Sequence, residues 1–473
     1  MNRAEDEGLE TSLDMDWVAS LEKRLASTKF KERDTEPTIY RVLDILKKVD
    51  PEAYEPLLVS LGPYHRDKPH LQAMNRIKWK CLKFVLDQNP SVALEDYLDR
   101  ITKLETRARD AYSEEVKMSS NSFVEMMLLD GCFVMITIMR HNLKMNISEE
   151  RTLWNRFEVI PDIFMLENQL PFFLLETLYE SAFPLGAPFR NLAFEYIRRI
   201  FTSNFELPSD TETFHHMIHL FLSCIDPKRN HGNSDGNGNQ FSIFGFLCRS
   251  KLVKTIASLP PKLCSSLLSQ MNKICSVRDA NPTKSVDFNV YDWIPNATVL
   301  NEAGIHFERK KRAKSFLDIT FRNGIPQLQI DDNTNSLLRN FIAYEQFSMG
   351  SKSHVSSYMQ LMDCLIDSAA DVEVLQQDDI IISGLGDNQE VATLINKLGM
   401  HVTMMEDFYL VDVVNAMKKH HNTRYNKWRA RLNRDYFGNP WAVITLFGAL
   451  LLFALTVIPQ TIYTILSYVR SQN

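Results

Sequence analysis

The chain ends in a long apolar run that leaves few ways to fold. No charged residue occurs from Tyr436 to Val469. As a helix, Trp441 to Tyr463 would span roughly 35 Å, enough to cross a hydrocarbon core of ~30 Å. These two aromatic residues stand where interfacial anchors of a membrane helix are found. We therefore predict a C-terminal transmembrane helix. The alternative is a buried core helix, which the length and uniform apolarity of the run disfavour.

Positive charge gathers on one side of this run. Arg470 follows it, whereas seven basic side chains precede it: Lys418, Lys419, Arg424, Lys427, Arg429, Arg431 and Arg434. The positive-inside rule places that flank, and the chain before it, in the cytosol. Each such side chain attracts anionic lipid by roughly 1 kcal/mol. We expect a single-pass, tail-anchored protein in the plasma membrane or an endomembrane. Glycosylation at Asn146 or Asn296 would contradict this orientation.

The rest of the chain has the composition of a globular protein with a sizeable core. Hydrophobic residues make up 45% and charged residues 24% of the 473 residues, which are ordinary values. The net charge of −6 argues against a nucleic-acid partner, for which a basic surface is expected. The seven cysteines form no C-x-x-C pair, which indicates reduced thiols instead of a disulfide framework.

Hydrophobic periodicity predicts a mainly helical body. Apolar residues recur at helical spacing in five segments: 16–29, 71–86, 337–347, 355–369 and 388–400. Asp387 is a candidate N-cap for the last of these. Phe123 to Met139 is almost wholly apolar, but Glu125 and Asp130 interrupt it. We interpret this stretch as a buried core helix and not as a second membrane span.

A change of period in the later half predicts a small antiparallel β-sheet. Segments 305–310, 315–321 and 326–330 alternate or carry β-favouring residues, with a turn signal at Asn323-Gly324. The predicted fold is therefore mainly α with this small sheet and one C-terminal transmembrane helix. We divide the chain into an acidic N-terminal extension (1–35), a mostly helical soluble domain (36–435) with a flexible loop at about 229–241, the transmembrane anchor with its flank (436–469) and a short tail (470–473).

Motifs of known chemistry are missing or incomplete. We find no Walker A loop, G-x-G-x-x-G, nucleophile elbow or kinase signature, and we assign no catalytic residue, metal ligand or cofactor. His215 and His219 have a spacing that zinc ligands use on a helix, but the glutamate of the metalloprotease motif is absent. We interpret them as helical histidines near the surface.

Two further patterns have simpler explanations than a binding site. Asp331, Asn333 and Asn335 match the first oxygen positions of an EF-hand loop, but the glycine and glutamate that the loop needs are absent. A helix cap from Asp332 or Asn333 is the preferred interpretation. The basic cluster at 308–315 resembles a nuclear signal, and we interpret it as a solvated hairpin turn.

A polar triplet interrupts the apolar stretch at 162–175. Glu167, Asn168 and Gln169 stand side by side shortly before Pro171. Because proline is accepted in the first turn of a helix and not in its interior, we predict a buried joint between two apolar segments. The three side chains would satisfy the orphan backbone groups there. Replacing Asn168 by leucine should then cost roughly 1–3 kcal/mol.

The collected segments resemble the plant-specific domain of unknown function 247 family. The similar blocks lie at 52–86, 127–134, 161–179, 297–307, 315–346 and 434–463, in the order of the family. The resemblance implies a plant protein with a mostly helical body, one C-terminal transmembrane helix and no established catalytic activity or cofactor. Some grass relatives are implicated in pollen–stigma self-incompatibility, which implies a recognition or signalling role. The chain departs from the family at Arg66-Asp67 and at 134–139, which cautions against transferring a partner.

Three functions remain open at this point. The first is a non-catalytic protein-interaction or recognition module, tethered to the membrane and bound to an unidentified protein partner. The second is a hydrolase-like enzyme that uses Glu167 with Asp162 or a histidine. The third is a transporter or channel accessory, which would need to oligomerise through the small residues Gly448-Ala449. The identity of the partner, the oligomeric state and the biological process are not contained in these patterns.

Overall fold

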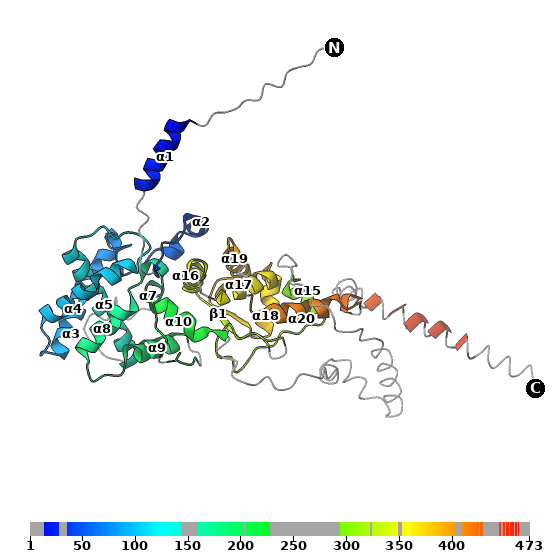
Figure 1. The fold of residues 1–473 in the computed structure, drawn as a ribbon. Coiled ribbons are helices and arrows are strands. Elements are labelled where there is room, and N and C mark those ends of the chain that lie inside the picture. Colours follow the sequence, from blue (N-terminus) through cyan, green and yellow to red (C-terminus); the bar gives the residue numbers. More distant parts are fainter. Residues whose placement is uncertain are drawn as a thin grey trace, which may run out of the picture.

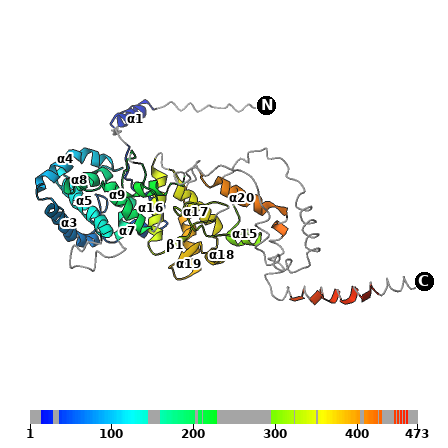
Figure 2. The same cartoon turned by 90° about the horizontal axis from the view of Figure 1, so that it is seen from below.

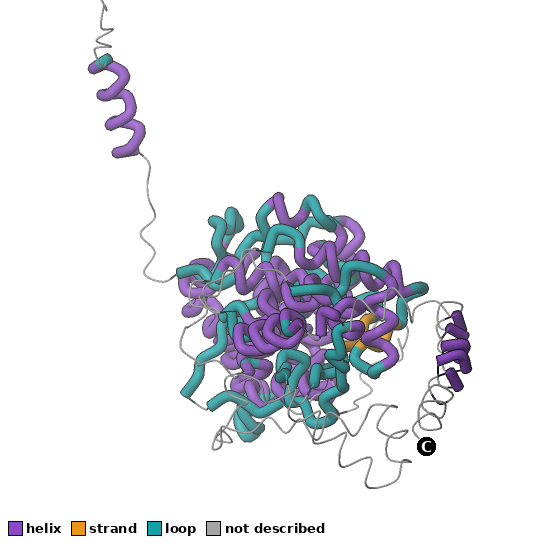
Figure 3. The backbone as a smooth tube through the Cα atoms, turned by 90° about the vertical axis from the view of Figure 1, so that its right-hand side faces the viewer, coloured by secondary structure: helices purple, strands orange, loops and turns teal. Residues whose placement is uncertain are grey.

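The computed structural model is mainly α-helical (Figures 1 and 3). It describes residues 14–27, 36–143, 159–201, 205–209, 211–227, 294–321, 324–348, 352–402, 408–424 and 426–428, with scattered residues between 444 and 462. The loop expected at 229–241 lies outside these ranges.

Helix α5 (Ser120–Leu143) is the centre of the first group of helices. It contacts α3 (Asn75–Gln88), α4 (Leu94–Asp110), α8 (Phe172–Ala182) and α9 (Phe189–Ile200). A helix that is apolar all round must bury every face, and neighbours on several sides allow this. By length and composition α5 is also the one described helix that would cross a bilayer, but 78% of its most apolar window is buried inside the protein. The predicted core helix is confirmed.

A glycine allows α5 and α8 to approach closely. A Cβ atom at Gly131 would overlap the side chain of Leu178 and would touch that of Leu174. The close approach therefore depends on the missing side chain.

The second group contains the later helices and two short strands (Figure 2). Its elements are α15 (Ala297–Glu302), β1 (Leu328–Ile330), α16 (Thr334–Phe347), α17 (His354–Leu365), α18 (Ala369–Gln377), β2 (Ile381–Ser383), α19 (Asn388–Gly399) and α20 (Val411–Asn422). The shorter elements of the first half are α1 (Met15–Ser27), α2 (Asp44–Lys47), η1 (Glu52–Tyr54), η2 (Pro69–Met74), α7 (Val159–Ile163), η3 (Leu166–Asn168) and α10 (Met217–Ile225). Helix α16 joins the two groups because it contacts η1, η3 and α10 as well as α17, and one hydrophobic core runs through both.

The predicted antiparallel sheet is wrong. Strands β1 and β2 pair in parallel, with Leu328 opposite Ile381 and Ile330 opposite Ser383. The segments 305–310 and 315–321 form no strand and contribute only isolated bridges, from Arg309 to Ile325 and from Thr320 to Gly324. A parallel pair needs a long crossover, and here α16, α17 and α18 supply it. The turn signals next to 326–330 suggested pairing with the preceding segments, whereas this strand pairs with β2.

Most predicted helices are present, and one cap is confirmed. Asp387 accepts a hydrogen bond of 2.7 Å from the backbone amide of Glu390 at the start of α19. The segment expected to be helical at 71–86 begins in the 3-10 turn η2 and continues as α3. Helix α2 is a single turn of four residues.

A buried carboxylate stabilises the start of α17. The side chain of Glu345 is 1% exposed, and it accepts hydrogen bonds from the backbone amides of Val355 and Ser356, both at 2.8 Å. Burial raises the pKa of Glu345 to about 7, although these hydrogen bonds oppose the rise. The favourable position at a helix N-terminus thus carries a cost for the ionised form.

This arrangement predicts a pH-dependent difference between the protein and its Glu345→Gln variant. Because the pKa of Glu345 rises from 4.5 to about 7 on folding, the folded state binds more protons between these values. Glu345 therefore lowers stability as the pH rises through this range, by up to roughly 1.4 kcal/mol for each pKa unit. Glutamine does not titrate, so the stability of the variant relative to the parent should increase as the pH rises from 4.5 to 7.5. Urea unfolding at several pH values would measure this, with Glu373→Gln on the exposed side of α18 as control. A difference that stays constant with pH would contradict it.

The C-terminal run is described only in part. The described residues between 444 and 462 are helical, and the large apolar side chains among them are exposed: Ile444, Leu451, Leu452, Phe453, Leu455, Val457 and Ile462. Trp441 and Tyr463, which mark the expected membrane interfaces, lie outside the described residues.

Candidate functional site

A sharp joint separates α7 from α8. Helix α7 ends at Ile163, the 3-10 turn η3 follows, and α8 begins at Phe172. Pro171 precedes the first residue of α8 with a φ of −58° and an extended ψ of 129°. The ring of proline is compatible with this entry to a helix and would break a continuous one. The backbone groups of the joint must therefore find partners outside regular helix.

The two amide side chains of the triplet supply many of these partners. The Nδ2 of Asn168 donates to the carbonyl oxygens of Val59 and Asp162 at 3.0 and 2.9 Å, and its Oδ1 accepts from the amide of Leu61 at 2.6 Å. The Nε2 of Gln169 donates to the carbonyls of Ile163 and Met165, at 2.6 and 2.8 Å. Asn168 thus connects the joint to a distant loop, while Gln169 closes the joint on itself.

Leucine at position 168 would leave three buried backbone groups without their side-chain partner. We expect Asn168→Leu to lower the free energy of unfolding by roughly 2–3 kcal/mol, since each stranded group costs ~1–3 kcal/mol and the loop can relax in part. Urea titration followed by circular dichroism would measure the loss. Asn121→Leu is the matched control, because Asn121 is exposed in the first turn of α5. Equal stability of the two variants would contradict the structural role.

The joint contacts the loop at residues 57–62. Several backbone amides of this loop donate to side chains and not to other backbone groups. Asp162 accepts from the amides of Leu57, Leu58 and Val59, each at 2.8 Å. Burial raises the pKa of Asp162 to about 6, against the lowering effect of these hydrogen bonds. The carboxylate is fully occupied by this loop.

A buried ion pair holds the other end of the loop. The Nζ of Lys78 lies 2.5 Å from Oδ1 of Asp130 and donates to the carbonyl of Ser60 at 2.6 Å. Asp130 also accepts from the amide of Gly62 at 2.9 Å. Gly62 has a φ of +71°, and a Cβ there would lie 2.8 Å from the hydroxyl of Tyr112. Glycine is therefore required both by the turn and by the close approach.

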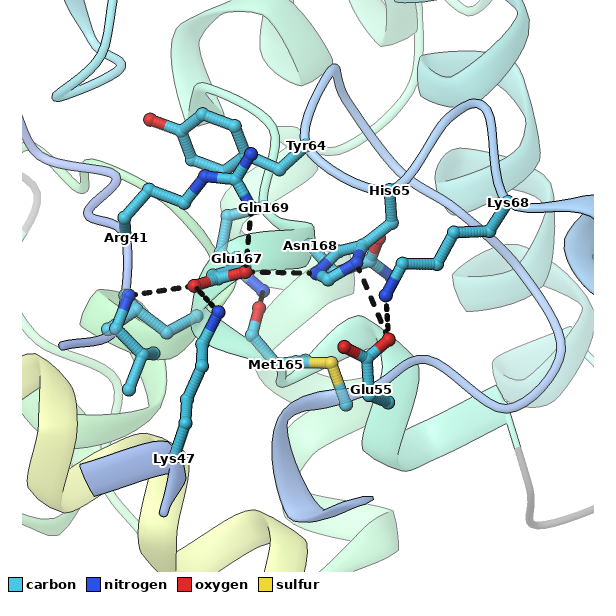
Figure 4. Close-up of polar contacts among 12 residues, drawn as sticks. Arg41, Lys47, Glu55, Tyr64, His65, Lys68, Met165, Glu167, Asn168 and Gln169 are labelled. Atoms are coloured by element: carbon cyan, nitrogen blue, oxygen red, sulfur yellow. Dashed lines mark hydrogen bonds and ion pairs between the residues drawn. The ribbon is translucent and has the colours of Figure 1, made fainter. Parts of the chain in front are cut away.

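Glu167 lies at the centre of a cluster of positive charge (Figure 4). Its side chain is fully buried. One carboxylate oxygen lies 2.6 Å from Nζ of Lys47 and accepts from the amide of Val42 at 2.8 Å. The other lies 3.1 Å from a guanidinium nitrogen of Arg41. Burial alone would raise the pKa of Glu167, but His65, Lys47 and Val42 together lower it to about 2.

His65 extends the cluster toward the surface. Its Nε2 lies 3.3 Å from Glu167 and its Nδ1 lies 3.9 Å from Glu55, which also pairs with Lys68. The ring is 2% exposed, and among the described residues neither nitrogen has a partner in good hydrogen-bond geometry. The sequence patterns did not single out His65. One signal could have identified His65. It directly follows Gly62, Pro63 and Tyr64, in a block that resembles the plant family.

This geometry does not support Glu167 as a general acid or base. Such a group needs a pKa near the working pH and a substrate within reach. The carboxylate of Glu167 is sealed from solvent, has a pKa of about 2 and is held by Arg41, Lys47 and the amide of Val42. Asp162, its suggested partner, binds a separate set of backbone amides. The arrangement is suited to fixing α2, the loop and the joint relative to one another.

The two histidines considered as zinc ligands lie in a packed region around the start of α10. Helix α10 begins at Met217, so His219 is helical and His215 is not, and their rings lie 4.4 Å apart. His216 between them is fully buried and caps α10 by accepting from the amide of His219. Burial keeps the pKa of His216 well below its usual value. Among the described residues no group of three or more His, Cys, Asp or Glu side chains is arranged to hold a metal ion.

The cap of α16 differs from the expected one. The carboxylate of Asp331 accepts from the amides of Asn333 and Thr334, both at 3.0 Å. Asp332 and Asn333 make no side-chain cap there. Asp331 was therefore the capping residue in a motif that resembled a calcium loop.

The basic flank is described in part. Lys418 and Lys419 lie on α20, and Arg424 and Lys427 follow in helical residues, with all but Lys418 exposed. Arg429, Arg431 and Arg434 lie outside the described residues.

The fold and its polar joint define a mostly helical protein whose internal charges have structural roles, and comparison with known proteins identifies its family. A family model described as a plant protein of unknown function matches residues 39–455. The chain belongs to this plant family, domain of unknown function 247. It is 28% identical to the UPF0481 protein At3g47200 of Arabidopsis thaliana over 92% of this chain and 87% of that protein. It is 22% identical to the putative UPF0481 protein At3g02645 of the same plant over 93% of each chain. No solved structure matches the chain.

Proposed function

We propose that this protein is a membrane-anchored, non-catalytic interaction module whose large domain faces the cytosol. The observation that carries the proposal is the set of described residues between 444 and 462, which are helical and whose large apolar side chains are 39–65% exposed. Exposed apolar surface of this extent marks a membrane or protein contact. The exposed basic side chains that follow α20 favour anionic lipid beside that helix.

Asn296 supports the cytosolic side. Its Oδ1 accepts from the amide of Val299 at 3.1 Å and its Nδ2 donates to Asp367 at 3.1 Å, so it caps α15. A glycan would replace one of the two hydrogens on this nitrogen and would crowd its contact with Asp367. This arrangement favours an unmodified Asn296, as expected on the cytosolic side.

Helix α1 supports a protein partner. It stands apart from the other described helices (Figures 1 and 2), and Trp17, Leu21 and Leu25 repeat every four residues on it. All three are exposed, at 56%, 39% and 63%. An amphipathic helix without a covered apolar face is a common element for docking into a groove of another protein. The acidic side chains before it favour a partner with a basic rim.

Alkaline carbonate extraction of plant membranes would test the anchor. The full chain should stay in the membrane pellet, whereas a chain that ends at residue 435 should be extracted. Extraction of the full chain, or retention of the shortened one, would contradict the anchor.

Proximity labelling would test the interaction role with matched variants. Trp17→Glu with Leu21→Glu should remove a defined set of labelled proteins, whereas Ala19→Glu with Ser20→Glu on the same exposed helix should keep it. Identical label patterns for the two pairs would exclude α1 as the docking element.

A further inference from the structure

A cavity lies where the two helix groups meet. Its volume is about 630 Å³, and its wall includes the end of α9, the middle of α10, the segment 309–316, the residues around β1 and the start of α16. This volume falls in the ~300–1,000 Å³ range of small-molecule sites. Neither Glu167 nor Asn168 lines it, so the cavity is separate from the polar joint.

The floor of the cavity is aromatic. The ring of Phe221 lies 4.4 Å from that of Phe201 and 4.6 Å from that of Phe341. Phe221 and Phe341 are covered by the protein, at 0% and 1% exposed, so the partly exposed Phe201 is the ring of this cluster that presents free surface. Leu337 and Leu338 of α16 extend this apolar surface. Such a floor is suited to an apolar group and offers few partners to a polar one.

The rim of the cavity is basic. Arg199, Arg309 and Lys311 line it and are exposed, and in the described parts of the chain none of the three pairs with a carboxylate. Lys310 also lines it but is occupied by Asp318 at 2.6 Å. The acidic lining residue, Asp331, binds the first amides of α16. The rim therefore keeps uncompensated positive charge.

We propose that this cavity binds a small amphiphile that has a phosphate or carboxylate head and an apolar tail. The guanidinium groups of Arg199 and Arg309 present paired donors that match such an anion. The tail would lie against the partly exposed side chains of Phe201 and Leu337, which the buried rings of Phe221 and Phe341 support from the core. A bare anion would leave the floor unused, and a neutral amphiphile would leave the rim unpaired.

Calorimetric titration of the full chain in neutral phosphatidylcholine nanodiscs would test the site, with empty discs subtracted. The probe is lauroyl lysophosphatidic acid below its critical micelle concentration. Glycerol 3-phosphate supplies the head alone, and lauroyl lysophosphatidylcholine supplies a tail with a neutral head group. We expect saturable one-to-one binding of the first probe and about tenfold or greater weakening for each of the other two.

Paired variants assign the binding to the cavity. The double variant Arg309→Gln with Lys311→Gln should bind the probe about tenfold or more weakly than the parent does. Arg312→Gln is the matched control, because Arg312 is exposed in the same basic segment but does not line the cavity. All these side chains are exposed, so the melting temperatures should stay unchanged. Equal binding of the head alone or of the neutral amphiphile would overturn the proposal, as would an equal loss in the control.

The source of the ligand can be separated in the same experiment. Discs that contain phosphatidic acid offer the head group from the bilayer, whereas the added probe offers it from solution. If the bilayer lipid enters the cavity, the probe should bind the parent more weakly in these discs while the paired variants show no change. If free amphiphiles alone enter, the two kinds of disc should give the same affinity.

Discussion

Replacing Glu167 by leucine should lower the free energy of unfolding by roughly 3 kcal/mol. Removing one member of a buried ion pair costs ~3–5 kcal/mol because the other charge is left without compensation. Here the lower end applies, since the side chains of Arg41 and Lys47 are 37% and 26% exposed and can regain water. The amide of Val42 and the ring of His65 are buried, so they cannot regain water in the variant. Urea titration of the full chain in detergent, followed by circular dichroism, would measure the loss.

Two controls make this result specific. Glu114 binds the same Arg41 at 3.2 Å, but its side chain is 58% exposed, so Glu114→Gln should cost less than ~1 kcal/mol. Glu167→Gln keeps an acceptor for Val42 and loses the charge, so it should fall between the two. A cost for Glu167→Leu no larger than that of Glu114→Gln would show that the cluster does not hold the fold.

The same carboxylate predicts a dependence on acid. The pKa of Glu167 falls from 4.5 to about 2 on folding, so the unfolded state binds more protons between these values. The contribution of Glu167 is complete above pH 4.5 and is lost as the pH falls toward 2. The stability gap between the parent and Glu167→Gln should therefore narrow over that range.

The joint shows which parts of such a site can be predicted from sequence. Pro171 and the polar triplet before it are local features, and the chemistry of proline and of orphan backbone groups applies to them directly. The partners of the triplet are not local. Glu167 binds Arg41 and Val42, more than a hundred residues away, and no spacing rule connects such positions.

Short strands and single side chains account for the other differences. Strand β1 has three residues, too few for alternation to distinguish a parallel partner beyond three helices from an antiparallel neighbour. Asp130 was visible as an interruption of the apolar run in α5. Its role depends on Lys78 of α3, which carries apolar neighbours and gave no signal of burial. The presence of a helix can be predicted from hydrophobic periodicity. A buried charge pair depends on tertiary packing between distant segments, which a single sequence does not reveal.

The buried pair of Lys78 and Asp130 leads to a second large expected effect. The two side chains are 5% and 3% exposed, so Lys78→Met and Asp130→Asn should each cost roughly 3–5 kcal/mol. The double variant should cost much less than the sum, because it leaves neither charge alone. It should still cost something, since the carbonyl of Ser60 loses the donor that Lys78 provides at 2.6 Å. A double-mutant cycle from urea unfolding at pH 7 measures the coupling.

An exposed pair provides the reference for this cycle. Lys103 and Asp99 also lie 2.5 Å apart, but on the surface of α4 with side chains 71% and 61% exposed. Their coupling should be only ~0.3–0.5 kcal/mol. Burial raises the pKa of Asp130 even beside Lys78, so the lone carboxyl in Lys78→Met should take up a proton more readily still. The cost of Lys78→Met should consequently shrink as the pH is lowered from 7, because the protonated acid no longer buries a charge. Single costs that add within ~0.5 kcal/mol would mean that the pair does not act as a unit in holding the 57–62 loop.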